Sequence, residues 1–433
     1  MIYKIQPAAM YYSWGSKKRI ERIFGIQNPG NDPVAELWYG THERGPSILI
    51  PKTTGARDLR QLLHTHQLPF LFKILSADGS LSIQAHPSKG QAELGFEREN
   101  RQGIDIDAPE RNYRDRNHKP ECLVAMEDFW ALSGFRKPGI IAEHFRTIAG
   151  TSPPPILEKL LTILDGGAFP EDSSSGNSSG ERTINGAFRS QSDTILRTFY
   201  SSLMRSKKTD QSLLMETALS EIASRGLGEN AARGGNGADG EMQWYWLREL
   251  HRQFPGDPGC LAPLYLNLLN LKRGEALFMK AGILHAYLQG TGLEIMANSD
   301  NVLRGGCTQK HVDVPELLSV IHFHADDPTR PLKSAEGWYE SFAPEFRIAI
   351  MDVPADSFLN LRAAEKLGED MGIILMLNGE AALWTSREEL LLKTGEAAFV
   401  ACSDADDAEL SVRTGSCEAS FALASVNVFG EWR

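Results

Sequence analysis

The pattern of hydrophobic and polar positions divides the chain into three stretches. Over residues 1–145, short β-forming runs alternate with Gly, Pro and polar clusters, most clearly at 69–76 and 81–85. From about 150 to 250, apolar residues recur at helical intervals, which predicts helices over 156–164, 194–204, 211–223 and 244–254. Strand patterns return at 276–279, 346–351, 372–377 and 397–401. We therefore expect a mainly β protein with a helical insertion.

Local composition refines this division. Gly, Ser and Asn dominate 166–179 and 226–240, which predicts mobile loops within the helical stretch. The sequence KRGEALF at 272–278 resembles KTGEAAF at 393–399, an echo that reflects either two related β units or chance. Only the first copy continues to a histidine, so a second unit of the same kind is expected to be free of metal.

Composition and charge exclude several classes of protein. The 433 residues suffice for about three domains, at roughly 150 residues per domain. A formal net charge of −11, from 56 acidic and 45 basic residues, disfavours a nucleic-acid or anionic-membrane partner. Five widely spaced cysteines lack a Cys-x-x-Cys pair, and no run of about 18 apolar residues or signal-peptide pattern occurs. We expect a cytoplasmic protein without a membrane span.

The first candidate chemical feature is the segment 82–87. Alternation along a strand places Ser82, Gln84 and His86 on one face. A strand face with three polar groups either meets water at a sheet edge or lines a cavity.

A second feature is Asn117-His118-Lys119-Pro120-Glu121, which precedes an apolar run. It reads either as a solvated turn, with Glu121 paired to Lys119, or as a strand entry that presents a carboxylate ligand to a metal.

A third feature is His285, which stands between Leu284 and Ala286 and by itself reads as a core histidine. The segment 294–310 that follows is unusually dense in polar side chains, which would need many partners if buried. Together, Gln84, His86, Glu121 and His285 supply two imidazoles, a carboxylate and an amide oxygen, a workable donor set for Zn²⁺. No spacing rule identifies such a site.

These motifs together resemble the type I mannose-6-phosphate isomerases, also called phosphomannose isomerases. The resemblance rests on Tyr12-Ser13-Trp14-Gly15 and on the segments 35–42, 81–89, 113–121, 132–136 and 282–310. It implies one zinc ion per chain, bound by Gln84, His86, Glu121 and His285, and a catalytic Arg304. It also implies two cupin-like jelly-roll β units with a helical domain between them. The expected limits are 1–148 and 255–325 for the catalytic unit, 149–254 for the helical domain and 326–433 for the C-terminal unit.

The sequence departs from the family pattern at two places. Glu43 replaces the usual proline after Thr41-His42, and Gly305-Gly306-Cys307 follows Arg304 where a small residue, Gly and Leu are usual. Neither departure involves an expected metal ligand, so they bear on loop shape.

The reaction implied by the resemblance interconverts mannose 6-phosphate and fructose 6-phosphate through an enediol, in mannose metabolism and GDP-mannose supply. A base must face the carbon-bound proton, and Glu294 is the leading candidate, with His118 and Lys119 as alternatives. Arg304 could stabilise the enediolate or bind the phosphate, for which Lys310, Ser82 and Lys89 are further candidates. Lys89 reads equally well as a solvated loop lysine, and Trp14 either walls the sugar site or anchors the core. The expected chain is a monomer.

A non-catalytic sugar-phosphate-binding cupin is the alternative class, but it would not need a base and a metal together. A zinc peptidase is disfavoured because the sequence contains no His-Glu-x-x-His.

Overall fold

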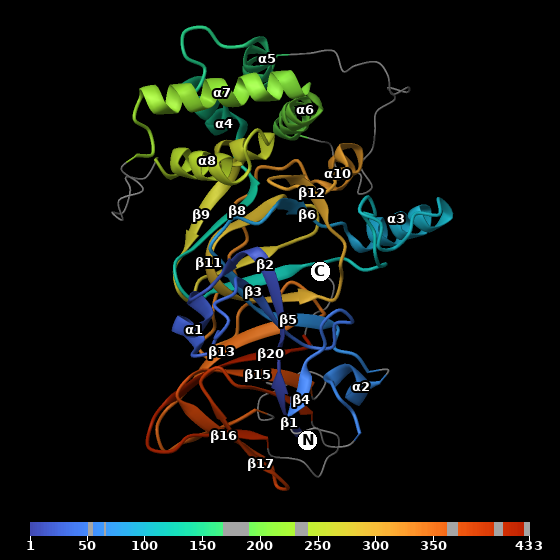
Figure 1. Ribbon diagram of the computed structural model, residues 1–433, viewed down its shortest axis with the longest axis vertical. Helices are drawn as coiled ribbons and strands as arrows, with labels where there is room; N and C mark the ends of the chain where they lie inside the picture. Colours follow the sequence, from blue (N-terminus) through green and yellow to red (C-terminus); the bar gives the residue numbers. More distant parts are fainter. Residues whose placement is uncertain are drawn as a thin grey trace.

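The structure is a computed structural model that describes residues 1–50, 55–64, 66–167, 190–229, 241–361, 371–401 and 410–427. It is mainly sheet, as expected, with a group of helices gathered at one end (Figure 1). Among the described residues, no helix combines the length and apolar character needed to cross a bilayer.

A ten-stranded antiparallel sheet forms the middle of the molecule. Its strands are β2 (Ala8–Ser16), β3 (Val34–Tyr39), β5 (Phe70–Ala77), β6 (Ile83–Ala85), β7 (Glu121–Ala125), β8 (Phe129–Phe135), β9 (Leu266–Leu271), β10 (Ala276–Met279), β11 (His285–Ala297) and β12 (Leu303–Gly306). The long strand β11 pairs with β5, β6, β7 and β8, so it joins all parts of this sheet. Its register aligns His285 with Gln84 near one end and Glu294 with Lys73 near the other.

Two further sheets lie beyond β5 (Figure 1). A six-stranded sheet contains β1 (Ile2–Gln6), β4 (Ile48–Ile50), β13 (Arg347–Val353), β15 (Met371–Asn378), β18 (Ala397–Ala401) and β20 (Ala419–Ser425). A four-stranded sheet contains β14 (Phe358–Asn360), β16 (Glu380–Trp384), β17 (Glu389–Lys393) and β19 (Ser411–Arg413). The N-terminal strand β1 lies between β18 and β4, so strands from within 1–148 pair with the C-terminal stretch. The expected domain limits remain a prediction, and these two strands cross them.

The helical stretch consists of α4 (Pro138–Thr147), α5 (Pro155–Leu164), α6 (Gln191–Arg205), α7 (Lys208–Ser224) and α8 (Met242–Gln253). Helix α6 begins at a capping box in which the side chains of Ser190 and Asp193 each accept the other's backbone N–H. The apolar faces of these helices share one core with Ile83, Leu132 and Leu303 of the ten-stranded sheet. The helical stretch is therefore packed directly on strands β6, β8 and β12.

The remaining helices are α1 (Arg19–Phe24), α2 (Leu59–Leu63), α3 (Lys89–Arg101), η2 (Pro258–Leu261), α9 (Ala262–Tyr265) and α10 (Val314–Val320), of which α3 is the longest. Helix α3 was not expected. Ser88 caps it through a capping box with Gln91, so Lys89 opens a helix and the loop interpretation of that lysine is wrong.

The helices and strands that the periodic patterns did predict are present in the structure. The four predicted helices correspond to α5, α6, α7 and α8, and the predicted strands to β5, β6, β10, β13, β15 and β18. Of the two predicted mobile loops, 168–179 and 230–240 lie outside the described residues. The polar segment 294–310 is partly regular, since Glu294 lies within β11 and Arg304 within β12.

Candidate metal centre and substrate pocket

Three strand ends bring a carboxylate and two imidazoles together. Glu121 opens β7, His285 opens β11 and His86 follows β6, and each is at most 1% exposed. Nε2 of His86 lies 3.3 Å from Oε1 of Glu121, and Nε2 of His285 lies 3.4 Å from Oε2 of Glu121. One ligand atom from each residue falls within 4.8 Å of the others, a cluster that could hold a metal ion. Glu121 is buried at the start of a strand and not in a solvated turn, although it does pair with Lys119. His285 is buried, as a core histidine would be, but its Nε2 has no hydrogen-bond partner among the described residues.

The protonation of this cluster also fits a metal. Nδ1 of His86 lies 2.8 Å from the carbonyl oxygen of Asn301, and Nδ1 of His285 lies 2.8 Å from that of Ile283. Because a carbonyl can only accept, each Nδ1 donates, and in a neutral imidazole the lone pair is then on Nε2. Both Nε2 atoms and Oε2 of Glu121 are buried without a hydrogen-bond partner in the described structure. Three orphaned acceptor atoms that face one another are what a bound cation would satisfy.

Electrostatics keeps the ligands in their metal-binding forms. Burial, followed by the charge of Lys119, lowers the pKa of His86 to about 4, so its imidazole is neutral. Burial acts to raise the pKa of Glu121, but the charge of Lys119, the largest opposing cause, holds that pKa well below its usual range. Nζ of Lys119 lies 2.9 Å from Oε1 of Glu121.

Gln84 reaches the site through strand register. It is aligned with His285 on β11 and with Arg304 on β12, and residues aligned across antiparallel strands project from the same face. Gln84 also lines the pocket beside the cluster, so the lined-cavity alternative for segment 82–87 is the correct one.

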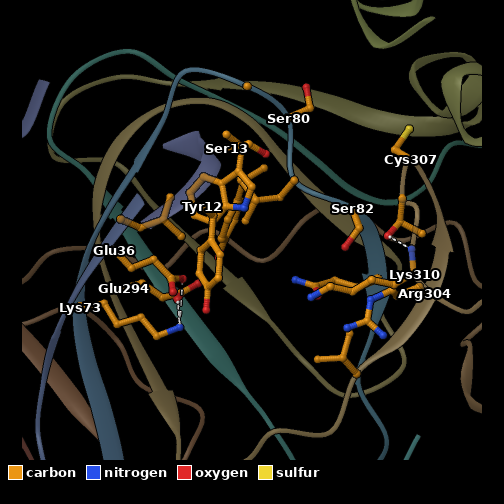
Figure 2. A pocket seen from close by; sticks show the side chains of 18 of the residues that line it. Tyr12, Ser13, Glu36, Lys73, Ser80, Ser82, Glu294, Arg304, Cys307 and Lys310 are labelled. Carbon is orange, nitrogen blue, oxygen red and sulfur yellow. Dashed lines mark hydrogen bonds and ion pairs between the residues drawn. The ribbon is translucent and has the colours of Figure 1, made fainter. Parts of the chain in front are cut away.

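The pocket has a volume of about 840 Å³, within the range of small-molecule sites. Figure 2 shows Glu36, Lys73 and Glu294 on one side of it and Ser82, Arg304 and Lys310 on the opposite side. The two sides differ in charge and in pairing.

An ion-paired triad forms the first side. Nζ of Lys73 lies 2.9 Å from Oε2 of Glu294 and 3.4 Å from Oε1 of Glu36, and all three side chains are buried. Burial raises the pKa of Glu294 although Lys73 opposes it, and the two carboxylates raise the pKa of Lys73 against its own burial. Sequence reasoning missed Lys73 and Glu36. The available signal was a single charge within each buried run, FLFKILSA for β5 and VAELWY for β3.

The opposite side is cationic. Burial lowers the pKa of Arg304, as does neighbouring Arg114, and burial together with Arg304, Arg114 and Arg44 lowers the pKa of Lys310. Within the described ranges, no carboxylate forms an ion pair with the side chain of Arg304 or Lys310. Arg44 pairs with Asp300, whereas Arg304 and Lys310 are left without a carboxylate partner in the described structure and so create a site at which an anion would be stabilised.

Comparisons with known proteins decide the family. A family profile described as "Phosphomannose isomerase type I, catalytic domain" matches residues 2–138. The mannose-6-phosphate isomerase of Escherichia coli (strain K12) is 32% identical over 420 residues, covering 93% of this chain and 95% of that protein. The chain belongs to the mannose-6-phosphate isomerase family. A crystal structure of a mutant phosphomannose isomerase from Salmonella typhimurium matches with a TM-score of 0.78 at 30% identity, covering 99% of this chain and 100% of that chain. A zinc-bound mannose 6-phosphate isomerase matches with a TM-score of 0.76 at 30% identity, covering the same shares.

Membership of the mannose-6-phosphate isomerase family confirms the expected enzyme class, an aldose–ketose isomerase. Of the residues expected from the family resemblance, most meet in the pocket: Trp14, Ser82, Gln84, Lys119, Glu121, Glu294, Arg304 and Lys310. Trp14 stacks on Tyr12, with ring centroids 5.6 Å apart. Lys119 faces Glu121, so its charge is committed to the metal cluster.

Two expected residues lie elsewhere in this family member. His118 does not line the pocket, and its Nε2 lies 2.6 Å from Oε1 of Glu345. Successive side chains of an extended segment point in opposite directions, so Lys119 and His118 cannot both face the sugar. Lys89 also lies outside the pocket lining, where its Nζ donates to Oδ1 of Asn117.

The two departures from the family pattern have different surroundings. Glu43 is largely exposed, outside the pocket lining, and pairs with Arg60 at 3.2 Å. Cys307 is buried at the pocket lining with φ of 52°, a left-handed conformation that is costly for a side chain other than Gly, Asn or Asp. Only the second departure touches the site.

Proposed function

We propose that the chain is a zinc-dependent isomerase that interconverts D-mannose 6-phosphate and D-fructose 6-phosphate. The observation that carries this proposal is the buried cluster of His86, Glu121 and His285, whose orphaned acceptor atoms border a pocket with an unpaired cationic side. A metal polarises the carbonyl, a buried acid transfers the proton and an anion site holds the phosphate, and these three components together suit a metal-dependent isomerase of sugar phosphates.

Zinc would be held by His86, Glu121, His285 and the amide oxygen of Gln84, one ion per chain. When bound, Zn²⁺ acts as a Lewis acid that polarises the oxygens at C1 and C2 of the open-chain sugar. The ligand residues are already in the forms that bind a metal: both imidazoles are held as the Nδ1–H tautomer, and Glu121 is held ionised.

Glu294 is the base of the proposed reaction. Its carboxylate takes the proton from C2 of the aldose, which leaves an enediolate with the negative charge on the oxygen at C1. The proton of the C2 hydroxyl moves to the oxygen at C1, and Glu294 returns its own proton to C1, so that C2 carries the carbonyl of the ketose and C1 the hydroxyl. Burial raises the pKa of Glu294, which brings its proton affinity closer to working pH. The ammonium of Lys73, 2.9 Å away, limits this rise and orients the carboxylate. Lys119 is the remaining alternative base, but its ammonium forms an ion pair with Glu121.

The cationic side binds the negative charges of the substrate. Lys310 and Ser82 bind the phosphate, which fixes the sugar chain across the pocket from Glu294. Arg304 is aligned with Gln84, an expected metal ligand, and lines the same pocket, so we assign to its guanidinium the stabilisation of the enediolate. Trp14 forms a wall of the sugar site with Tyr12.

The finer architecture belongs to the same proposal. We infer two cupin-like jelly-roll units, a catalytic one over 1–148 and 255–325 and a metal-free one over 326–433, with a helical domain over 149–254 between them. The four-stranded sheet, which lies within the C-terminal stretch, and the six-stranded sheet, to which that stretch contributes β13, β15, β18 and β20 beside β1 and β4, support the second unit. We further propose a cytoplasmic monomer that contributes to GDP-mannose supply and binds neither nucleic acid nor membranes.

A coupled assay for fructose 6-phosphate formed from mannose 6-phosphate tests this function. The chain is expected to be active, to lose activity on chelation and to regain it with zinc. Absent activity, or activity indifferent to complete metal removal, would overturn the proposal.

A further inference from the structure

We propose that Asn301 and Asp115 form a clamp that positions the metal ligand His86; the inference rests on the proposed zinc centre. Neither residue contributes an atom to the cluster of His86, Glu121 and His285. Both act through hydrogen bonds, so they are positioning residues.

The clamp begins at the backbone of Asn301. Its carbonyl oxygen accepts the hydrogen bond from Nδ1 of His86 at 2.8 Å. This bond fixes both the tautomer and the ring orientation of His86, and hence the direction in which the Nε2 lone pair points. The place of this carbonyl therefore decides whether His86 can bind a metal well.

The side chain of Asn301 holds that carbonyl in place. It is 0% exposed, and its Oδ1 accepts from the backbone N–H of Arg114 at 2.7 Å and of Asp115 at 3.2 Å. Its Nδ2 donates to the carbonyl oxygens of Asp115 at 2.9 Å and Asn117 at 2.8 Å. A flipped amide would oppose donor to donor and acceptor to acceptor, so this geometry admits only one orientation.

Asp115 completes the clamp from the other segment. Its Oδ1 accepts from the backbone N–H of Asn117 at 2.7 Å, and its Oδ2 accepts from that of Asp300 at 2.8 Å. The hydroxyl of Ser299 donates to the same carboxylate at 2.9 Å. These bonds join the segment that leads into Glu121 to the segment that carries the carbonyl of Asn301.

The second histidine of the cluster offers a contrast. Nδ1 of His285 bonds the carbonyl of Ile283, only two residues earlier on the same chain segment. The partner of His86 is instead 215 residues distant in sequence, so it has to be positioned by tertiary contacts. A clamp is needed for one histidine and not for the other.

The test compares zinc affinity, measured by competition with a chromophoric chelator, in the full-length wild type and three variants. Asn301→Ala removes the side-chain half of the clamp. Asp115→Asn keeps the shape, but whichever way its amide turns, the NH₂ faces the backbone N–H of Asn117 or Asp300. Asn298→Ala is the matched control. Asn298 lies in the same loop as Asn301, but its side-chain amide donates to the carbonyl oxygen of Leu68 and not to a group that holds His86. The d–d absorption spectrum of each Co²⁺-loaded form reports ligand geometry.

We expect the zinc dissociation constant to rise about 10- to 100-fold in Asn301→Ala and Asp115→Asn, with an altered cobalt spectrum. Asn298→Ala should lose thermal stability yet keep the wild-type affinity and spectrum. If both clamp variants fold and bind zinc as the wild type does, or if Asn298→Ala weakens zinc as much as they do, the clamp is refuted. Should Asn301→Ala fail to fold, the zinc affinity and cobalt spectrum of Asp115→Asn decide whether the clamp exists. A wild type that binds no zinc would overturn the proposed function itself, and the clamp with it.

Discussion

Replacing Lys73 by methionine tests the electrostatics of the pocket most directly. The ammonium of Lys73 lies between the carboxylates of Glu294 and Glu36, all at most 7% exposed. Removing one partner from a buried ion pair leaves charge uncompensated, which costs about 3–5 kcal/mol of unfolding free energy. The flexible methionine occupies similar volume, so little of this loss should come from a cavity.

The sign of the pH dependence identifies the cause. Burial already raises the pKa of Glu294 and Lys73 opposes that rise, so its loss should raise the pKa of Glu294 further. Between the ordinary glutamate pKa and this raised value, the folded variant binds more protons than the unfolded chain, so its stability falls as pH increases. The free energy of unfolding of Lys73→Met should therefore fall further below that of the wild type near pH 8 than near pH 5.

Urea unfolding at both pH values provides the measurement. Lys4→Met is the control, because the Lys4 and Glu396 pair is partly exposed and should contribute at most about 1 kcal/mol. Adding Glu294→Gln to Lys73→Met should restore part of the stability, since the pair is then replaced by neutral groups. A loss in Lys73→Met no larger than in the control, or a loss independent of pH, would refute the argument.

Other predictions concern the ligands and the cationic side. Glu121→Gln and His285→Ala should each lose zinc and isomerase activity together, as measured by metal analysis and the coupled assay; full zinc occupancy with normal turnover would remove that residue from the metal site. Arg304→Ala should retain zinc while kcat falls by about a hundredfold or more, and a near-normal rate would exclude its catalytic role. Lys310→Ala should mainly raise KM for mannose 6-phosphate, with less effect on a substrate that lacks the phosphate; an unchanged KM would contradict phosphate binding there.

Sequence periodicity was sufficient for elements whose structure is set locally. The helix intervals at 194–204 and the apolar run at 69–76 led to α6 and β5 within a few residues of their ends. Helix α3 was missed because its residues are mostly polar and include two glycines, so no apolar stripe marks it; its start depends on the capping box at Ser88.

The site was predictable only where motif and alternation agreed. Alternation predicted that Ser82, Gln84 and His86 share one face, and the structure places Ser82 and Gln84 in the pocket lining and His86 in the buried cluster. That His86 belongs with Glu121 and His285 followed only from the family resemblance. It could not reveal the partner of Lys73, because Glu294 lies 221 residues away and meets it only through the register of β11 with β5. His118 was expected at the pocket because it adjoins Lys119, yet the same alternation directs it to Glu345.

The pairing of β1 with β18 has a consequence for the order of folding. Ile2 is aligned with Val400, so during synthesis β1 must wait for almost 400 further residues before its neighbour β18 exists. Closing so long a loop costs only about 2 kcal/mol more entropy than closing one of ~50 residues, so the delay is kinetic more than thermodynamic. Until then β4 is the one strand paired with β1 among the described residues, and Ile2 lacks its core neighbours, because the other members of its cluster lie within 338–423. Chains that stop before β18 should therefore aggregate through these two strands, even where the ten-stranded sheet has formed.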